Sequence, residues 1–115
     1  MAIIKHEPDR LSKAFSALAD PTRRAILVRL AAGEATVSEL MAPFALTQPT
    51  ISKHLKVLEQ AGLIEQGRDA QRRPRRLAAA ALEDVTGWVD AFHREWAGRF
   101  DQLAAHLAAI KTKER

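Results

Sequence analysis

The side chains best suited to chemistry in this chain gather at the start of one segment, residues 47–63, which reads TQPTISKHLKVLEQAGL. They offer amide, hydroxyl, imidazole and ammonium groups, which can form hydrogen bonds with base edges or with phosphate oxygens. An amide suits adenine, and an ammonium group suits guanine or phosphate, so Gln48 and Lys53 are the leading candidates for base contacts. The residues expected to contact DNA are Gln48, Pro49, Thr50, Ser52, Lys53, His54 and Lys56. For His54, the alternative is a surface residue that supports the fold.

The rest of this segment predicts the helix that would hold those groups. The hydroxyl of Thr47 can accept a hydrogen bond from a free amide of the first turn. Ile51, Leu55 and Leu58 follow at steps of four and three, so one face of the helix is expected to be buried. Gly62 stands where a left-handed residue would end the helix.

A second helix is predicted immediately upstream. Thr36 and Glu39 match the reciprocal capping pattern of a helix N-terminus. Pro43 indicates that this helix ends near Ala42, which leaves residues 44–46 as a short turn. Two helices joined by a tight turn, the second with a polar start, make a helix-turn-helix.

At this point the chain resembles the ArsR family of bacterial winged-helix transcriptional regulators. The resemblance lies in TVSELMAPFALTQPTISKHLKVLEQAGLI, in the earlier ALADPTRRAILVRLAAGE and in the basic stretch after Ile64, and it covers roughly residues 10 to 108. It implies a mainly α fold with a small β-hairpin, a winged helix-turn-helix of about five helices and a two-stranded wing. The family commonly has Gly where this chain has Ala45. A left-handed backbone there would make the Cβ cost about 1 kcal/mol or somewhat more.

Basic residues follow the second helix of the motif. Gly67, Asp69 and Pro74 are turn signals within EQGRDAQRRPRRL, so we expect a strand, a basic tip and a return strand. The planar guanidinium group of arginine can contact phosphates through two donors or enter a narrow minor groove. The wing residues expected to contact DNA are Arg68, Arg72, Arg73, Arg75 and Arg76. The alternative is a disordered basic loop with no role in DNA binding.

Two further arginines follow the predicted cap Asp20 and the helix-starting Pro21. Arg23 and Arg24 could contact phosphate near the N-terminus of this helix. Alternatively, they form a solvated pair that neutralises Asp20. The sequence does not separate these two roles.

A long helical pattern runs from residue 80 to 110 and carries both tryptophans of the chain. Its aromatic surface exceeds what a helix packed only on a domain this small would need, which favours self-association. The resemblance implies that the first and last helices form a dimer interface; the alternative is an intrachain core. The expected interface residues are Leu11, Phe15, Trp88, Phe92, Trp96, Phe100, Leu103 and Leu107. A symmetric dimer would place its two copies of the helix predicted within residues 47–63, the recognition helix, about 34 Å apart. This spacing implies an inverted-repeat operator.

Length and composition limit the other possibilities. A chain of 115 residues suits one domain, expected at 10–110 with an extension at 1–9 and a tail at 111–115. A net charge of +4 favours polyanionic partners. The absence of cysteine excludes disulfides, zinc–thiolate sites and thiol redox sensing. With neither a signal peptide nor a transmembrane segment in the sequence, we expect a cytoplasmic protein without membrane contact.

We expect no cofactor, no metal and no enzymatic activity. Metal-sensing members of the family use cysteines before the turn, or Asp and His pairs on the last helix. Asp90 and His93 could supply two such ligands here, but His106 and Ala109 break the paired pattern. The sequence therefore predicts a homodimeric repressor specific for an operator near its own or a neighbouring operon. The alternatives are a protein-interaction module docking through the last helix, a non-specific nucleoid-type binder, or a metal-sensing repressor.

Overall fold

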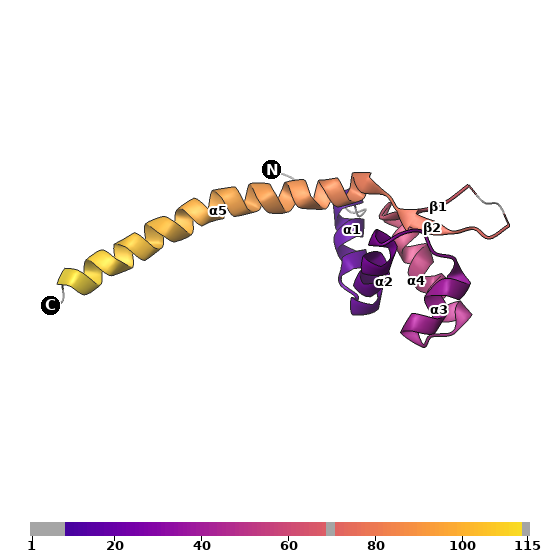
Figure 1. Ribbon diagram of the computed structural model, residues 1–115. Helices are drawn as coiled ribbons and strands as arrows, with labels where there is room; N and C mark the ends of the chain where they lie inside the picture. Colours follow the sequence, from indigo (N-terminus) through magenta and orange to yellow (C-terminus); the bar gives the residue numbers. More distant parts are fainter. Residues whose placement is uncertain (1–8, 69–70, 114–115) are drawn as a thin grey trace. The chain divides into compact units, whose positions relative to one another are not determined.

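The structure is a computed structural model that describes residues 9–68 and 71–113 (Figure 1). Its elements are α1 (Arg10–Leu18), α2 (Pro21–Ala31), α3 (Val37–Phe44), α4 (Gln48–Gln60), β1 (Ile64–Gln66), β2 (Arg75–Leu77) and α5 (Ala79–Lys113). The predicted five helices and two-stranded wing are confirmed. Most of the extension expected at 1–9, the turn residue Asp69 and the last two residues of the expected tail lie outside the described residues. The chain divides after Val85 into two compact units, so the predicted domain limits stay a prediction.

The core of the first unit joins all four short helices to the wing. Its largest fully buried side chains are Ile26, Leu40, Ile51, Leu55, Leu58 and Leu63. Burial of each such side chain stabilises the fold by about 1.5–3 kcal/mol. Figure 1 shows α2, α3 and α4 clustered, with the strands next to them. This packing fixes the back of α4 and leaves its other side to solvent.

Helix α3 begins as predicted and ends later than predicted. The hydroxyl of Thr36 accepts from the Glu39 amide at 3.2 Å, and the Glu39 carboxylate accepts from the Thr36 amide at 3.1 Å. The end expected near Ala42 is wrong, because the helix continues through Pro43 to Phe44. Pro43 stands next to last, so its missing amide removes one bond at the very end of the helix rather than in its middle. The left-handed backbone of Ala45, with φ 52° and ψ 36°, ends the helix instead.

Replacement of Ala45 by Gly is expected to raise the free energy of unfolding by about 0.5–1 kcal/mol, because Gly relieves the Cβ strain at positive φ while adding freedom to the unfolded chain. Urea denaturation measures the change. Ala42→Gly is the matched control, since Ala42 lies within α3 and is exposed. The control should lose about 1 kcal/mol. Equal destabilisation by both substitutions would contradict strain at Ala45.

Helix α4 is bounded at both ends by the predicted residues. Thr47 caps its start, with its hydroxyl 3.4 Å from the Thr50 amide. Gly62 has φ +75° at its end, as the sequence indicated. The amides of Gly62 and Leu63 donate to the carbonyls of Glu59 and Leu58, each at 3.0 Å, which completes a Schellman motif. Both ends of the helix are therefore fixed by local bonds.

The wing is a short antiparallel hairpin. Ile64 pairs with Leu77, Glu65 with Arg76, and Gln66 with Arg75. Gly67 continues the hairpin by donating to the Pro74 carbonyl at 2.7 Å, and a Cβ on Gly67 would lie 2.9 Å from Pro74 Cγ. Glycine is therefore the residue that this close approach requires.

A further bridge extends the wing and was not predicted. Ala35, just before α3, pairs with Arg75 through two backbone hydrogen bonds of 2.8 and 3.1 Å. The wing is therefore held from the side of α3 as well as by its own strands.

Helix α5 spans 35 residues, from Ala79 to Lys113, and so extends beyond the predicted range of 80 to 110 at both ends. Ala81 is buried in the core of the first unit. From Thr86 onward the helix forms the second unit.

Candidate nucleic-acid interface

The start of α4 presents the polar side chains that the sequence singled out. Gln48, Pro49, Ser52, Lys53 and Lys56 are exposed, and Thr50 and His54 are half-buried. The hydroxyl of Thr50 lies 3.0 Å from that of Thr47, so it also belongs to the helix cap. The first turn therefore combines a fixed backbone with exposed hydrogen-bonding groups.

His54 faces the cap of another helix. Its Nδ1 lies 4.0 Å from Asp20 Oδ2, and its side chain is 20% exposed. The backbone amide of Arg23 donates to the Asp20 carboxylate at 3.0 Å and lowers the pKa of Asp20 below its ordinary value. His54 thus lies where α4 meets the start of α2, and the DNA contact expected of it stays a prediction.

Arg23 and Arg24 are bound to the end of α1. Arg23 donates from Nε to the Ala17 carbonyl at 2.8 Å and from Nη2 to the Ser16 carbonyl at 3.2 Å. Arg24 donates from Nη1 to the Leu18 carbonyl at 2.7 Å. Cations at a helix C-terminus stabilise its free carbonyls. Sequence reasoning missed this role, because it depends on the angle between α1 and α2, and the predicted phosphate contacts stay a prediction.

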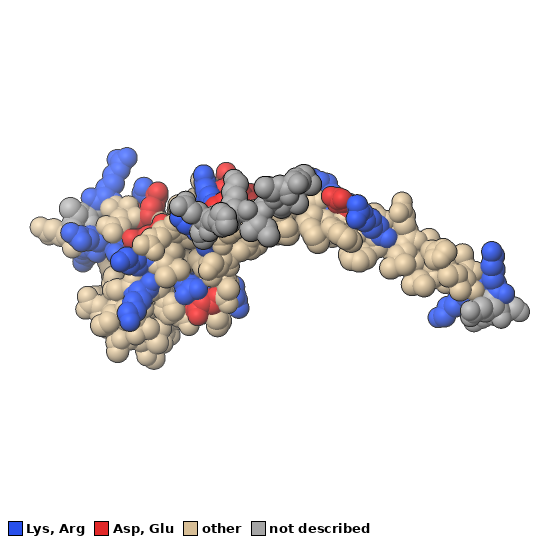
Figure 2. Space-filling model, turned by 180° about the vertical axis from the view of Figure 1, so that it is seen from behind, with Lys and Arg blue, Asp and Glu red and all other residues tan. Residues whose placement is uncertain are grey.

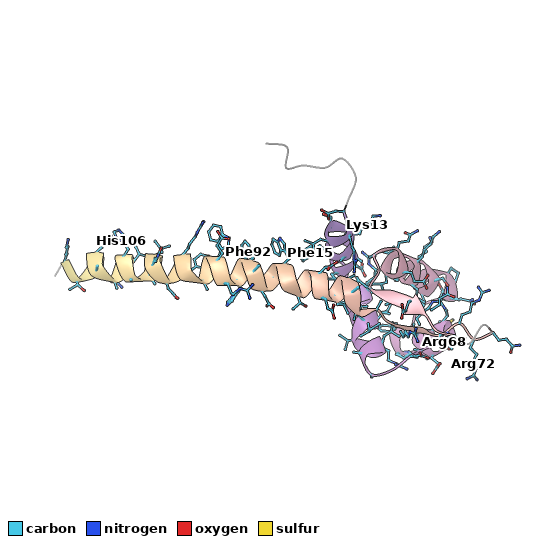
Figure 3. All side chains as sticks on the ribbon, turned by 90° about the horizontal axis from the view of Figure 1, so that it is seen from above. Lys13, Phe15, Arg68, Arg72, Phe92 and His106 are labelled. Carbon is cyan, nitrogen blue, oxygen red and sulfur yellow. The ribbon has the colours of Figure 1, made fainter. Side chains whose placement is uncertain are left out.

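The five wing arginines fall into two groups. Arg68, Arg72 and Arg73 are exposed, and Figure 3 shows Arg68 and Arg72 at the outer end of the hairpin. Arg75 and Arg76 are half-buried and form ion pairs, with Nε 2.6 Å from Glu59 Oε1 for Arg75 and 2.8 Å from Glu65 Oε1 for Arg76. The sequence placed all five on the wing but did not separate the two groups.

The wing end also lies near the start of α3. A groove there is lined by Thr36, Ser38, Glu39, Gln71 and Arg72. The pKa of Glu39 is lowered, chiefly by the Thr36 amide and to a smaller extent by the positive charges of Arg29 and Arg72. Arg72 therefore lies close enough to the start of α3 for its charge to act on Glu39.

The second unit exposes a continuous aromatic row on α5. Ring centroids are 5.2 Å apart for Trp88 and Phe92, 5.6 Å for Phe92 and Trp96, and 6.0 Å for Trp96 and Phe100. Phe92 is 46% exposed and Phe100 is 61% exposed. Much of the α5 surface in Figure 2 is tan, without Lys, Arg, Asp or Glu. We call this set Trp88, Phe92, Trp96 and Phe100 the aromatic row.

The remaining candidate interface residues are also at the surface. Leu103 and Leu107 continue the exposed apolar side of α5, and Phe15 on α1 is 37% exposed. Leu11 is half-buried. Exposed apolar surface of this extent is typical of a site where a partner binds. The assignment of these residues to a dimer interface stays a prediction.

Within residues 9–68 and 71–113, no group of three or more His, Cys, Asp or Glu side chains is placed to hold a metal ion. Over that same part of the chain, none of the helices combines the length and apolar character needed to cross a membrane.

Comparison with known proteins identifies the family. The model of the arsR family of bacterial regulatory proteins matches residues 20–66. The chain is 35% identical to the transcriptional repressor SdpR of Bacillus subtilis, over 69% of this chain and 88% of that protein. It is 41% identical to the HTH-type transcriptional regulator Rv2034 of Mycobacterium tuberculosis, over 74% of this chain and 77% of that one.

Solved structures agree with this assignment. The crystal structure of the ArsR family transcriptional regulator RHA00566 has a TM-score of 0.71 at 37% identity, covering 82% of this chain and 97% of that one. A homodimeric winged helix-turn-helix DNA-binding domain from Mycobacterium bovis has a TM-score of 0.61 at 27% identity, covering 83% and 92%. The chain therefore belongs to the arsR family of bacterial regulatory proteins.

Proposed function

We propose that this chain, a DNA-binding transcriptional regulator by family and fold, is a homodimeric repressor that occupies an inverted-repeat operator near its own or a neighbouring operon. The observation that carries this proposal is the start of α4, whose exposed polar residues are backed by a buried face. The Bacillus subtilis relative is itself named a transcriptional repressor. Such a regulator would work in the cytoplasm, without enzymatic activity.

We assign different tasks to α4 and to the wing. The first turn of α4 would read base edges, with Gln48 suited to adenine and Lys53 to guanine or phosphate. Arg68, Arg72 and Arg73 are exposed on the wing and would contribute mainly sequence-independent attraction to phosphates. A net charge of +4 supports this attraction.

Dimerisation would be carried by the aromatic row of α5, extended by Leu103 and Leu107 and joined by Leu11 and Phe15 of α1. The exposed apolar side chains support this assignment, because large apolar patches on a soluble protein mark interaction sites. The Mycobacterium bovis neighbour is described as homodimeric. A two-fold dimer matches an operator with two-fold symmetry.

Footprinting on the promoter upstream of the gene tests the proposal. We expect protection of two half-sites separated by about 10 base pairs, centre to centre. A scrambled duplex of the same length and base composition is the control. Equal affinity for the promoter and the scrambled duplex would contradict sequence-specific repression and would favour a non-specific nucleoid-type binder.

Substitution of Arg72 by Gln is expected to weaken binding to operator and random DNA alike, because a phosphate contact carries no sequence information. The slope of log K against log salt should fall by about one unit for each wing. Fluorescence anisotropy over a range of salt concentrations measures both quantities. Lys13→Gln is the control, since it removes the same charge from α1, away from the outer end of the hairpin (Figure 3). A loss confined to the operator, or an equal effect of the control, would argue against a phosphate contact by Arg72.

A further inference from the structure

Arg75 lies in β2 and faces the end of α4. Its Nε is 2.6 Å from Oε1 of Glu59, in the last turn of α4. The side chains of Arg75 and Glu59 are only 14% and 28% exposed. For comparison, the pair formed by Arg76 and Glu65 within the hairpin is 42% and 51% exposed. The Arg75–Glu59 pair is therefore the more shielded of the two, and it joins two elements that are separate in the sequence.

Arg75 is held by two more sets of bonds. Its backbone exchanges two hydrogen bonds with Ala35, the residue that precedes the cap of α3. Its Nη1 donates to the carbonyl of Arg73, which has a positive φ of 47° in the wing. Arg75 thus bonds α4, the segment before α3 and the chain leading to the wing end. Two of its guanidinium nitrogens are engaged within the protein.

The wing needs such external anchors. Each of its strands has three residues, and an isolated hairpin of two short strands is marginally stable in water. Without anchors, the outer end of the hairpin would sample several directions relative to α4. DNA binding would then have to order the wing, and the lost freedom would reduce affinity.

We propose that Arg75 is a positioning residue, which together with Glu59 sets the direction of the wing relative to α4. In this role it lets the exposed arginines of the wing and the start of α4 engage the same operator, and it does not contact DNA itself. The inference rests on the proposed function, because it presumes that both surfaces bind one DNA site. It also gives Glu59, which sequence reasoning did not single out, a part in DNA recognition.

The test compares Glu59→Gln with Glu65→Gln. Each substitution removes one negative charge, so any general change in attraction to DNA is the same in both. Glu59→Gln disrupts the link between α4 and the wing, whereas Glu65→Gln disrupts a pair within the hairpin. We expect operator affinity, measured by anisotropy, to fall about five- to tenfold for Glu59→Gln relative to Glu65→Gln, as for other directly coupled contacts.

A double-mutant cycle with Arg72→Gln separates positioning from general destabilisation. If the pair acts through the wing, Glu59→Gln should cause a smaller loss once Arg72 is gone than in the wild-type background, so the two effects should not fully add. Simple additivity would overturn the proposal. Thermal unfolding of each variant confirms that it is folded at the assay temperature. If Glu59→Gln is not, the comparison is made between Glu59→Asp and Glu65→Asp, which keep the charge but withdraw the oxygen from Arg75 and from Arg76.

Two other outcomes overturn the proposal. Equal operator affinity of Glu59→Gln and Glu65→Gln would show that the pair does not position the wing. A gain in affinity for all sequences with Glu59→Gln alone would show that Arg75, once released, is a phosphate contact. Both results can be interpreted only if the wild-type protein binds its operator more tightly than random DNA. If the wild type shows no such preference, the proposed function itself is refuted.

Discussion

A Trp96→Ala variant is expected to be monomeric at concentrations at which the wild-type chain is a dimer. Trp96 stacks with Phe92 and makes a tilted ring contact with Phe100, and the guanidinium carbon of Arg99 lies 4.8 Å from its ring centroid, so it stands within the aromatic row. Truncation of an aromatic residue at the centre of an interface costs about 2–4 kcal/mol. A two-fold interface uses each residue twice, so the dissociation constant of the dimer should rise by at least about a thousandfold.

Sedimentation equilibrium over a range of protein concentrations measures this change. Gln102→Ala is the control, because Gln102 is exposed on α5 at about 120° around the helix from Trp96. Operator affinity should fall together with dimerisation, since the two half-sites are then bound by separate molecules. A Trp96→Ala variant that remains dimeric would place the interface elsewhere. A monomeric wild type would favour a module that docks other proteins through α5.

The sequence predicted the elements whose causes are local. Thr36, Thr47 and Asp20 cap their helices as expected, because a capping side chain bonds an amide only three residues away. Gly62 ends α4 for an equally local reason. The end of α3 was misplaced because a proline near a helix terminus is less disruptive than one in the interior.

The roles of individual arginines could not be predicted in the same way. Arg75 finds its partner Glu59 sixteen residues away, across the interface between β2 and α4. Arg23 bonds carbonyls of a different helix, where the sequence offered Asp20 as its partner. Such pairings depend on how helices and strands pack, and a count of basic residues carries no information on that packing. The sequence therefore indicated where positive charge lies but not which charges are available to DNA.

At the start of α4, the side chain of Gln48 is exposed and can be reached by DNA. Replacement of Gln48 by Ala is expected to cost about 1–3 kcal/mol per half-site on the operator and nothing measurable on random DNA. The reason is that an amide paired with a base edge discriminates between base pairs, whereas phosphate contacts do not. Gln48 is the first residue of α4 and is exposed, so its removal opens no cavity in the core.

Gln60→Ala provides the matched control, because it makes the same chemical change at the last residue of the same helix, which is also exposed. It should leave the affinity for both kinds of DNA unchanged. Anisotropy with the operator, with operators altered at one base pair of each half-site, and with random duplex distinguishes the cases. If Gln48 reads a base, one altered operator should bind wild type and Gln48→Ala equally, because the contact is already lost there. A uniform loss on every duplex, with the salt dependence changed as for Arg72→Gln, would instead place Gln48 near phosphate and move base recognition to Lys53 or Ser52.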